Sequence, residues 1–196
     1  MRRDAYFYRS AYRRGRPRWD SDEPRTQLVA LVEGRVPGRA LDLGCGTGTD
    51  ALFLASKGWD VIGVDFAPEA IATASRRARE AGSTAHFVVG DVSQLTAANV
   101  RGPFDLIVDI GCFHAVPNRL RDNYARGVAQ VARPGADFYL TGIDSPPLTW
   151  RLVGASGVSL AELRRRFGGD FDVSEDPQSA GEHLGMHFRD YHLVRK

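Results

Sequence analysis

The chain reads Ala40-Leu41-Asp42-Leu43-Gly44-Cys45-Gly46-Thr47-Gly48-Thr49-Asp50 at the point that decides its fold. Three glycines in five residues let the backbone turn sharply after an apolar strand and leave no Cβ between the main chain and a ligand. A second apolar run ends in Asp65, which lies 23 residues after Asp42. A carboxylate at that spacing can accept hydrogen bonds from ribose hydroxyls. The pattern predicts a binding loop for an adenosine-containing cofactor.

Two classes of cofactor fit the glycine loop. The spacing of Gly46, Gly48 and Ala51 also satisfies the dinucleotide fingerprint, whose third position accepts alanine. Asp42 separates the two classes, because a carboxylate two positions before the first glycine repels a pyrophosphate. It suits a positively charged amino group or sulfonium. The sequence therefore favours S-adenosylmethionine, with a nicotinamide cofactor as the alternative.

Five segments of this chain resemble the motifs of the class I S-adenosylmethionine-dependent methyltransferases, in the order and spacing of that family. They are 41–48, 63–71, 87–92, 104–109 and 131–136. The resemblance covers nearly the whole chain. It implies an α/β fold with a Rossmann-like, seven-stranded, mostly parallel sheet and an antiparallel strand near the C-terminus.

The resemblance also implies which residues bind the cofactor. They are Trp19, Asp42, Gly44, Cys45, Gly46, Thr47, Gly48, Asp65, Phe66, Asp91, Val92, Asp109 and Ile110. Within this set, Asp65 is expected to bind the ribose and Asp91 the adenine amino group.

The spacing of apolar residues and the positions of glycine and proline predict the same architecture, independently of the resemblance. Apolar runs predict strands at about 39–43, 59–64, 85–89, 104–110 and 136–143. Helical patterns occupy about 24–34, 49–58, 68–81, 119–133 and 159–167. Strands that alternate with helices indicate a parallel sheet. Two final runs, about 170–176 and 186–195, have no helix between them and predict an antiparallel pair at one edge of the sheet.

A length of 196 residues predicts a single domain over 1–196, with an N-terminal lid or arm at 1–24 and an acceptor-side insert at 145–158. No run of 18 apolar residues and no apolar segment after the N-terminal arginines is present, so we expect a cytoplasmic protein without a membrane span. The two cysteines lack metal-ligand spacing, so no metal site is predicted. The sequence does not indicate an oligomeric state.

Charge is concentrated at the N-terminus. Residues 1–18 hold seven arginines and one acidic residue, a net charge of +6, although the whole chain carries +2 and residues 19–196 therefore carry −4. Tyrosine and phenylalanine residues lie between these arginines, a pattern that can bind RNA by phosphate contacts and base stacking. The acidic remainder shows no RNA-binding module. A small-molecule partner is therefore favoured over nucleic acid.

The same N-terminal segment is similar to the lid of small-molecule methyltransferases of the thiopurine and phenolic-substrate type. The similarity rests on Tyr12, Arg18-Trp19-Asp20 and Pro24 in that order. An aromatic ring such as Trp19 shields a sulfonium from water and packs on an aromatic acceptor. The alternative is that Trp19 only fastens the first helix to the core.

Methyl transfer requires alignment and desolvation of the acceptor more than a dedicated base. If a base exists, it should follow the fourth strand, where His114 is the candidate because its ordinary pKa of about 6.5 suits proton removal at neutral pH. Asp109 is the second catalytic candidate, and each residue has a structural alternative. The predicted acceptor-binding residues are Tyr12, Trp19, His114, Trp150 and Arg151.

The sequence thus predicts an S-adenosylmethionine-dependent methyltransferase that acts on a hydroxyl or thiol of a small, aromatic molecule in secondary metabolism or detoxification. Two alternatives stay open at this point. One is an RNA methyltransferase that uses the basic arm, and the other is a non-catalytic S-adenosylmethionine-binding protein.

Overall fold

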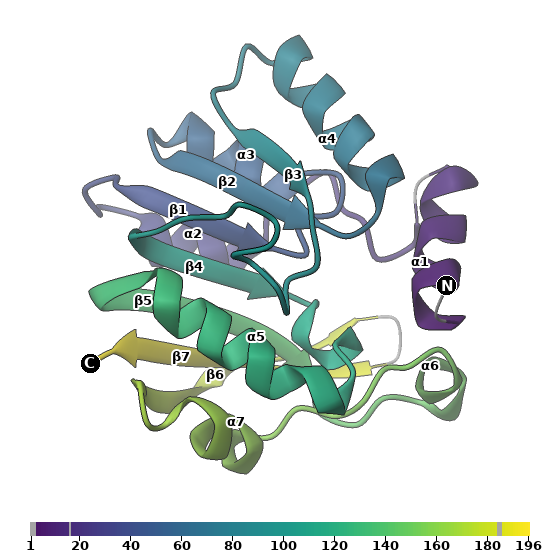
Figure 1. Cartoon of the computed structure of the whole chain (residues 1–196), viewed down its shortest axis with the longest axis vertical. Coiled ribbons are helices and arrows are strands. Elements are labelled where there is room, and N and C mark those ends of the chain that lie inside the picture. Colours follow the sequence, from purple (N-terminus) through teal and green to yellow (C-terminus); the bar gives the residue numbers. More distant parts are fainter. Residues whose placement is uncertain (1–2, 16, 184–185) are drawn as a thin grey trace.

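Seven strands form one sheet at the centre of the molecule (Figure 1), in the order β3-β2-β1-β4-β5-β7-β6. The structure is a computed structural model that describes residues 3–15, 17–183 and 186–196. The strands are β1 (Arg39–Leu43), β2 (Asp60–Asp65), β3 (His86–Val89), β4 (Phe104–Ile110), β5 (Ala132–Ile143), β6 (Phe171–His183) and β7 (Met186–Arg195). Strands β1 to β5 pair in parallel, whereas β7 lies antiparallel between β5 and β6. The predicted fold class and the antiparallel edge are confirmed.

Helices cover both faces of this sheet. They are α1 (Arg3–Arg13), α2 (Thr26–Val32), α3 (Thr49–Ser56), α4 (Pro68–Glu80), α5 (Asn118–Val131), α6 (Leu148–Leu152) and α7 (Leu160–Phe167), with a 3₁₀ turn η1 (Phe113–Ala115). The predicted helices are present within a few residues of their expected bounds. Within the described part of the chain, no helix is long and apolar enough to cross a membrane.

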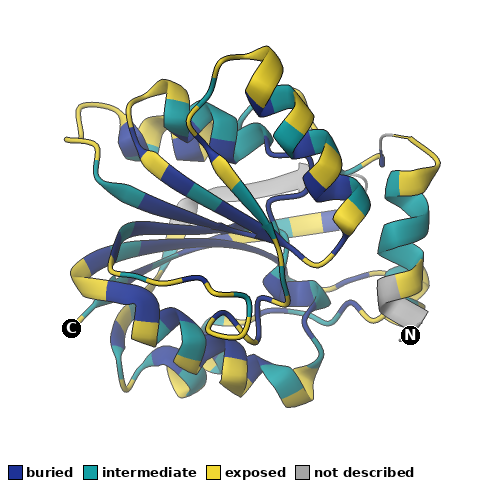
Figure 2. Ribbon diagram, turned by 45° about the horizontal axis from the view of Figure 1, so that its top comes forward, coloured by how far each residue is buried: buried dark blue, intermediate teal, exposed yellow. Residues whose placement is uncertain are grey.

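The core consists of two apolar layers, one on each face of the sheet. Successive side chains of β1 point to opposite faces of the sheet and so belong to different layers. Ala40 packs with α2 and α3, whereas Leu41 and Leu43 pack with α5 and α7. Figure 2 shows buried strands between helices whose outer surfaces are exposed. Burial on both faces explains why the parallel strands read as nearly continuous apolar runs.

Two segments differ from the prediction. The fifth strand begins at Ala132 rather than near residue 136, because Ala132 already pairs with Phe104 before the next pairing joins Asp137 to Leu106. The extra residues form a bulge, in which Gly135 has a φ of +79°. The N-terminal arm contains a regular helix, α1, which periodicity did not predict.

The order of the strands places a crevice at the carboxyl end of the sheet. The chain crosses from β1 to β2 on one side and later returns to β4 on the other side of β1. Open α/β sheets bind their ligands at this topological switch point. Helix α1 lies across the same end of the sheet (Figure 1). The segment predicted as a lid therefore lies across the carboxyl end of the sheet, and its action as a lid stays a prediction.

Gly48 provides a test of the packing behind the glycine loop. Its φ is +86°, and a Cβ at this position would lie 2.7 Å from the ring of Phe87. Gly48→Ala should lower the free energy of unfolding by about 2–5 kcal/mol, from about 1–2 for the left-handed backbone and about 1–3 for overpacking. Gly82→Ala is the matched control, because Gly82 has a φ of +61° and open space around it. Urea unfolding that shows equal losses for both variants would contradict this packing role.

Candidate active site

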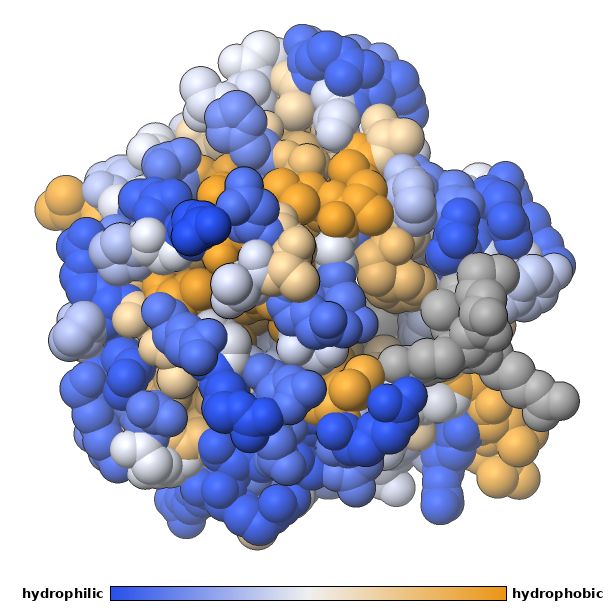
Figure 3. Space-filling view, viewed as in Figure 1, coloured by the Kyte–Doolittle hydropathy of each residue, from blue (hydrophilic) through white to orange (hydrophobic). Residues whose placement is uncertain are grey.

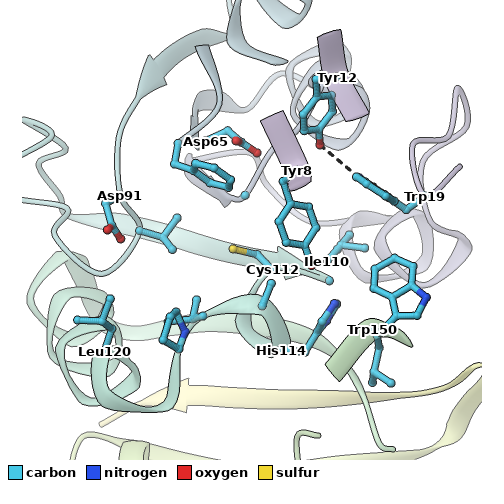
Figure 4. Close-up of a pocket in the computed structure, with 18 of the residues that line it drawn as sticks. Tyr8, Tyr12, Trp19, Asp65, Asp91, Ile110, Cys112, His114, Leu120 and Trp150 are labelled. Carbon is cyan, nitrogen blue, oxygen red and sulfur yellow. Dashed lines mark hydrogen bonds between the residues drawn. The ribbon is translucent and has the colours of Figure 1, made fainter. Parts of the chain in front are cut away.

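A cavity of about 270 Å³ lies at the carboxyl end of the sheet beneath α1 (Figure 4). A smaller cavity of about 70 Å³ adjoins it, with Tyr12, Trp19, Arg25, Gly44 and Ile110 lining both. Residues from β2 and the loop after β3 line one end of the larger cavity. Residues from η1, β5, α6 and β7 line the other end. We call these the nucleoside end and the acceptor end.

The glycine loop forms the floor between the two cavities. Gly44 and Gly46 have φ values of +75° and +53°, in the left-handed region that favours glycine. A Cβ on Gly46 would lie 2.9 Å from the Tyr12 hydroxyl, and one on Gly44 would lie 2.7 Å from the sulfur of Cys112. Tyr12 and Cys112 approach the backbone of the loop so closely that both positions require glycine.

Asp65 fastens this loop to the end of β2. Its Oδ2 accepts a hydrogen bond of 3.1 Å from the Gly46 amide, and its Oδ1 accepts one of 2.8 Å from the Ala67 amide. The carboxylate also lines the larger cavity. Burial raises the pKa of Asp65 to about 6. Each carboxylate oxygen has further lone-pair capacity, so Asp65 can bind a ribose as predicted.

Asp42 presents an unsatisfied acceptor. The side chain is buried and lines the smaller cavity, and among the described residues its Oδ2 has no hydrogen-bond partner. Burial, together with the nearby charges of Asp50, Asp109 and Asp65, raises the pKa of Asp42 well above its ordinary value. A buried acceptor without a partner is costly. A positively charged ligand group removes that cost, so the site fits a cofactor such as S-adenosylmethionine.

The nucleoside end carries the other predicted cofactor residues. Asp65, Phe66, Asp91 and Val92 line it together. Asp91 uses one oxygen, Oδ1, to accept hydrogen bonds from the amide and hydroxyl of Ser93 at 2.8 and 2.7 Å. Its carboxylate is thereby oriented at the cavity wall.

An aromatic roof covers the cavity. Trp19 is central to it, with its ring centroid 5.5 Å from that of Tyr8, 6.2 Å from Tyr12 and 5.8 Å from Trp150. Its indole N–H donates a 3.4 Å hydrogen bond to the Tyr12 hydroxyl. Figure 4 shows Tyr8, Trp19 and Trp150 around one space. Tyr12, Trp19 and Trp150 are therefore brought together as the sequence predicted, and Tyr8 is an additional member.

Polar contacts fix this roof to the body of the protein. The Arg9 guanidinium lies 2.9 Å from the carboxylate of Glu69, which ties α1 to α4. The Thr47 hydroxyl donates a 2.8 Å hydrogen bond to Asp20 and accepts one from Arg77. Thr47 is not among the described residues that line either cavity. Its hydroxyl holds the roof, and its contact with the cofactor stays a prediction.

His114 is the polar side chain of the acceptor end. It is 4% exposed, lines the cavity, and its Nδ1 has no hydrogen-bond partner among the described residues. Burial and the charge of Arg121 lower the pKa of His114 to about 4. The expectation based on an ordinary pKa is therefore wrong in one respect. The imidazole is neutral at neutral pH, but it is a weaker base than a free histidine.

Arg121 holds the loop that carries His114. Its guanidinium is buried and donates to the carbonyl oxygens of Val116 and His114 at 3.1 and 3.2 Å. It also donates to the Ser156 hydroxyl at 2.7 Å and to the Glu162 carboxylate at 2.8 Å. Arg121 thus contacts both walls of the acceptor end, η1 and the insert 145–158, which a backbone hydrogen bond of 2.9 Å from Ser156 to His114 also joins.

Asp109 holds the loop after β4, and its catalytic and cofactor-binding roles stay predictions. It is fully buried, and its Oδ1 accepts hydrogen bonds from the amides of Cys112 and Phe113 at 2.8 and 3.1 Å. Its Oδ2 accepts a 2.6 Å hydrogen bond from the Tyr124 hydroxyl. Asp109 is not among the described residues that line either cavity. Its carboxylate shapes the loop, whereas its neighbour Ile110 lines both cavities.

The insert contributes less to the cavity than predicted. Trp150 faces the cavity, but Arg151 is exposed and is not among its described lining residues. Leu148 and Leu152 are 69% and 73% exposed and belong to the outer surface at α6, where Figure 3 shows an apolar patch at lower right. The spacing along the short helix explains this, because residues two apart point to opposite sides.

Several lining residues were not predicted from the sequence. Arg25 lines both cavities, and Met186 and Phe188 line the acceptor end from β7. Met186 and Phe188 lie in an ordinary apolar strand, so no local signal marks them. Arg25 follows Pro24 of the lid pattern, which was a signal that the prediction did not use. Among the described residues, no group of three His, Cys, Asp or Glu side chains is placed to hold a metal ion.

Comparison with known proteins establishes the class of the chain. A methyltransferase-domain family matches residues 40–135, which contain the glycine loop, Asp65, Asp91 and His114. An uncharacterized methyltransferase of Schizosaccharomyces pombe is 32% identical over 113 residues, which make up 58% of this chain and 75% of the relative. The chain belongs to the class I S-adenosylmethionine-dependent methyltransferases, and its cofactor is S-adenosylmethionine.

Two further proteins are similar over more of the chain. The 2-heptyl-1-hydroxyquinolin-4(1H)-one methyltransferase of Mycobacteroides abscessus is 37% identical over 151 residues, 76% of this chain and 66% of the relative. A solved structure from work on the conversion of a disulfide bond into a thioacetal group during echinomycin biosynthesis has a TM-score of 0.80 and 28% identity. That alignment covers 97% of this chain and 91% of the other.

Asp65→Ala should weaken binding of S-adenosylhomocysteine by about 1–3 kcal/mol, because hydrogen bonds to a charged group are lost. Isothermal titration calorimetry measures the effect. Asp60→Ala is the matched control, since Asp60 opens the same strand but is exposed and pairs with Arg39. Unchanged affinity in Asp65→Ala would exclude the ribose contact.

The ligand-free protein should become more stable as the pH falls from 7 to 5. Burial raises the pKa values of Asp50, Asp65 and Asp109 to about 6, above their ordinary 3.8, so the folded chain binds more protons than the unfolded chain in this window. His114, with its pKa of about 4, acts in the opposite direction but is a single group. Urea unfolding at both pH values tests the sign. Asp65→Asn should reduce the gain, and a lower stability at pH 5 would contradict the account.

Proposed function

We propose that this protein transfers a methyl group to a hydroxyl of a small, planar aromatic molecule, with a thiol as the second candidate acceptor. The observation that carries the proposal is the buried, neutral imidazole of His114, which lines a mainly apolar and aromatic part of the cavity. Trp150, Ile143, Met186 and Phe188 provide the apolar wall. A flat acceptor buries its ring against them and presents one polar group to His114.

S-adenosylmethionine supplies, when bound, a methyl carbon activated by a positively charged sulfur. Asp42, Asp65 and Asp91 hold the cofactor by its charged and polar groups. Trp19 and Trp150 exclude water from the acceptor end, which favours displacement because the attacking atom has to be desolvated. The protein's main task is to align the acceptor oxygen.

His114 orients the acceptor and receives its proton. The neutral imidazole accepts a hydrogen bond from the acceptor hydroxyl. Because burial lowers the pKa of His114 to about 4, the imidazole is a weak base, and a more acidic hydroxyl loses its proton to it more readily during methyl transfer. Phenols, enols and N-hydroxy heteroaromatics have such hydroxyls, whereas aliphatic alcohols do not.

The named relatives support this acceptor class. The M. abscessus relative is a methyltransferase of 2-heptyl-1-hydroxyquinolin-4(1H)-one, a heteroaromatic compound with a hydroxyl group. The structure from echinomycin biosynthesis concerns sulfur chemistry and favours the thiol as the second candidate. RNA is a weaker candidate, because Tyr8 and Tyr12 contact Trp19 in the roof and are not free to stack on bases.

An acceptor screen tests the proposal. The purified protein is incubated with S-adenosylmethionine and 2-heptyl-1-hydroxyquinolin-4(1H)-one, a simple phenol, an aromatic thiol or a short RNA, and products are identified by mass spectrometry. We expect an added methyl group on the hydroxyl compounds first. Quinoline, which has the ring without the hydroxyl, is the control. Methylation of RNA alone would refute the proposal.

His114→Ala should lower kcat with the hydroxyl acceptor by about 100-fold, the lower end of the range for a general base, because a weak base contributes less. The affinity for S-adenosylhomocysteine should stay within about twofold, since His114 lies at the acceptor end. In the wild-type protein kcat should be constant from pH 5 to pH 8, because His114 stays neutral there. An acid limb near pH 6.5 that disappears in His114→Ala would contradict the low pKa.

A further inference from the structure

Arg121 is a buried cation behind the acceptor end. It lies in α5, and its side chain is 2% exposed. Its Nε donates to the carbonyl of Val116, and its Nη2 donates to the carbonyl of His114 and the hydroxyl of Ser156. Its Nη1 donates to the carboxylate of Glu162. A buried ion pair is weak evidence for a stabilising role, because the desolvation of both charges offsets their attraction. The arginine therefore calls for an explanation in the function of the site.

The contacts of Arg121 hold the main chain at His114. The carbonyl oxygen of His114 accepts hydrogen bonds from the Ser156 amide at 2.9 Å and from Arg121 at 3.2 Å. The guanidinium also lies over the ring of Phe113, 4.6 Å from the ring centroid. The imidazole lies near the loop after β4, where a Cβ on Gly111 would be 3.6 Å from its Cε1. The peptide of His114 is thus fixed, and with it the direction in which the imidazole leaves the backbone.

We propose that Arg121 is a positioning residue for methyl transfer, which holds the backbone of His114 and Ser156 so that the imidazole faces the acceptor. This assignment rests on the function proposed above, in which His114 orients the acceptor and receives its proton. Arg121 is not among the described residues that line either cavity, so it acts through His114 rather than on the reacting atoms. A misplacement of about 1 Å can lower a rate by about 100-fold. Loss of these contacts should therefore appear in kcat.

Arg166 of α7 is a matched control for Arg121. Its side chain is 3% exposed, and it donates a 2.9 Å hydrogen bond to the same carboxylate, that of Glu162. Its other partners are Asp122 and Asn118 of α5, so within the described chain it hydrogen-bonds neither η1 nor the insert. Because Glu162 keeps one arginine when the other is replaced, neither replacement leaves this carboxylate without a cation. A purely structural role predicts similar effects for both replacements.

The variants Arg121→Met, Arg121→Lys and Arg166→Met test the proposal. Urea unfolding establishes that each is folded, and calorimetry gives its affinity for S-adenosylhomocysteine. Initial rates give kcat and KM for 2-heptyl-1-hydroxyquinolin-4(1H)-one. We expect Arg121→Met to lower kcat by about 10- to 100-fold. The acceptor KM and the S-adenosylhomocysteine affinity should change by less than about threefold, as for an interaction that serves the transition state.

The two other variants sharpen this expectation. Arg121→Lys keeps the charge and should recover part of the loss, although an ammonium does not reproduce the planar fork of the guanidinium. Arg166→Met should leave kcat within about twofold of the wild-type value, because independent sites do not couple. An unchanged kcat in Arg121→Met, or an equal loss in Arg166→Met, would overturn the proposal.

A double-mutant cycle shows whether Arg121 acts through His114. In the His114→Ala background, Arg121→Met should lower kcat by less than about threefold, because the group that Arg121 positions is absent. An equal loss of kcat with and without His114 would show that Arg121 acts on the fold, and would overturn the proposal.

A spectroscopic signal tests the positioning without any acceptor. The Cε1–H signal of the His114 ring, in a carbon–proton NMR correlation spectrum of the S-adenosylhomocysteine complex, is identified by its absence in His114→Ala. It should shift and broaden in Arg121→Met and keep its wild-type position in Arg166→Met. One position in all three proteins would overturn the proposal. A wild-type protein that methylates no hydroxyl compound would instead contradict the proposed function, and this signal would still decide the role of Arg121.

Discussion

The hydrogen bonds of Asp65 are the constraint on which the site depends. One carboxylate joins the amide of Gly46, in the loop after β1, to the amide of Ala67, at the start of α4. The glycine loop, the end of β2 and the helix that carries Glu69 are thereby held in one arrangement. Glu69 in turn fixes α1 through Arg9, so the floor and the roof of the cavity are linked through neighbouring elements.

The buried polar groups are of two kinds. Some have all their hydrogen-bond partners within the protein, and others have an atom without a partner. Asp109 and Arg121 are satisfied by loop amides, carbonyls and side chains, and they set the positions of η1 and the insert. Asp42 and His114 each have a buried hydrogen-bonding atom without a partner in the described chain. Such groups are costly in a folded protein unless a ligand completes them. Asp42 lines the smaller cavity and His114 the larger one.

The sequence was sufficient to predict the features that depend on residues close together in the chain. The glycine loop, the carboxylate at the end of β2 and the alternation of strands and helices depend on residues close together in the chain, so the sheet and the cofactor class were predictable. The side chains of Asp109 and Thr47 turn to Tyr124 and Asp20, partners that their positions in the motif do not reveal. Arg151 is exposed in this structure, because the turn of a short helix decides which side chains face the cavity.

The sequence by itself determined the class of protein, the cofactor and the strand ends at which the site forms. Only the tertiary structure decided that α1 closes over the cavity, that His114 is neutral, and that Arg25 rather than Arg151 is the cavity's arginine. The reason is physical. Motifs encode backbone turns and residue types, whereas desolvation and the partners of a charged side chain depend on elements that meet only after folding, as Arg121 meets Ser156 and Glu162.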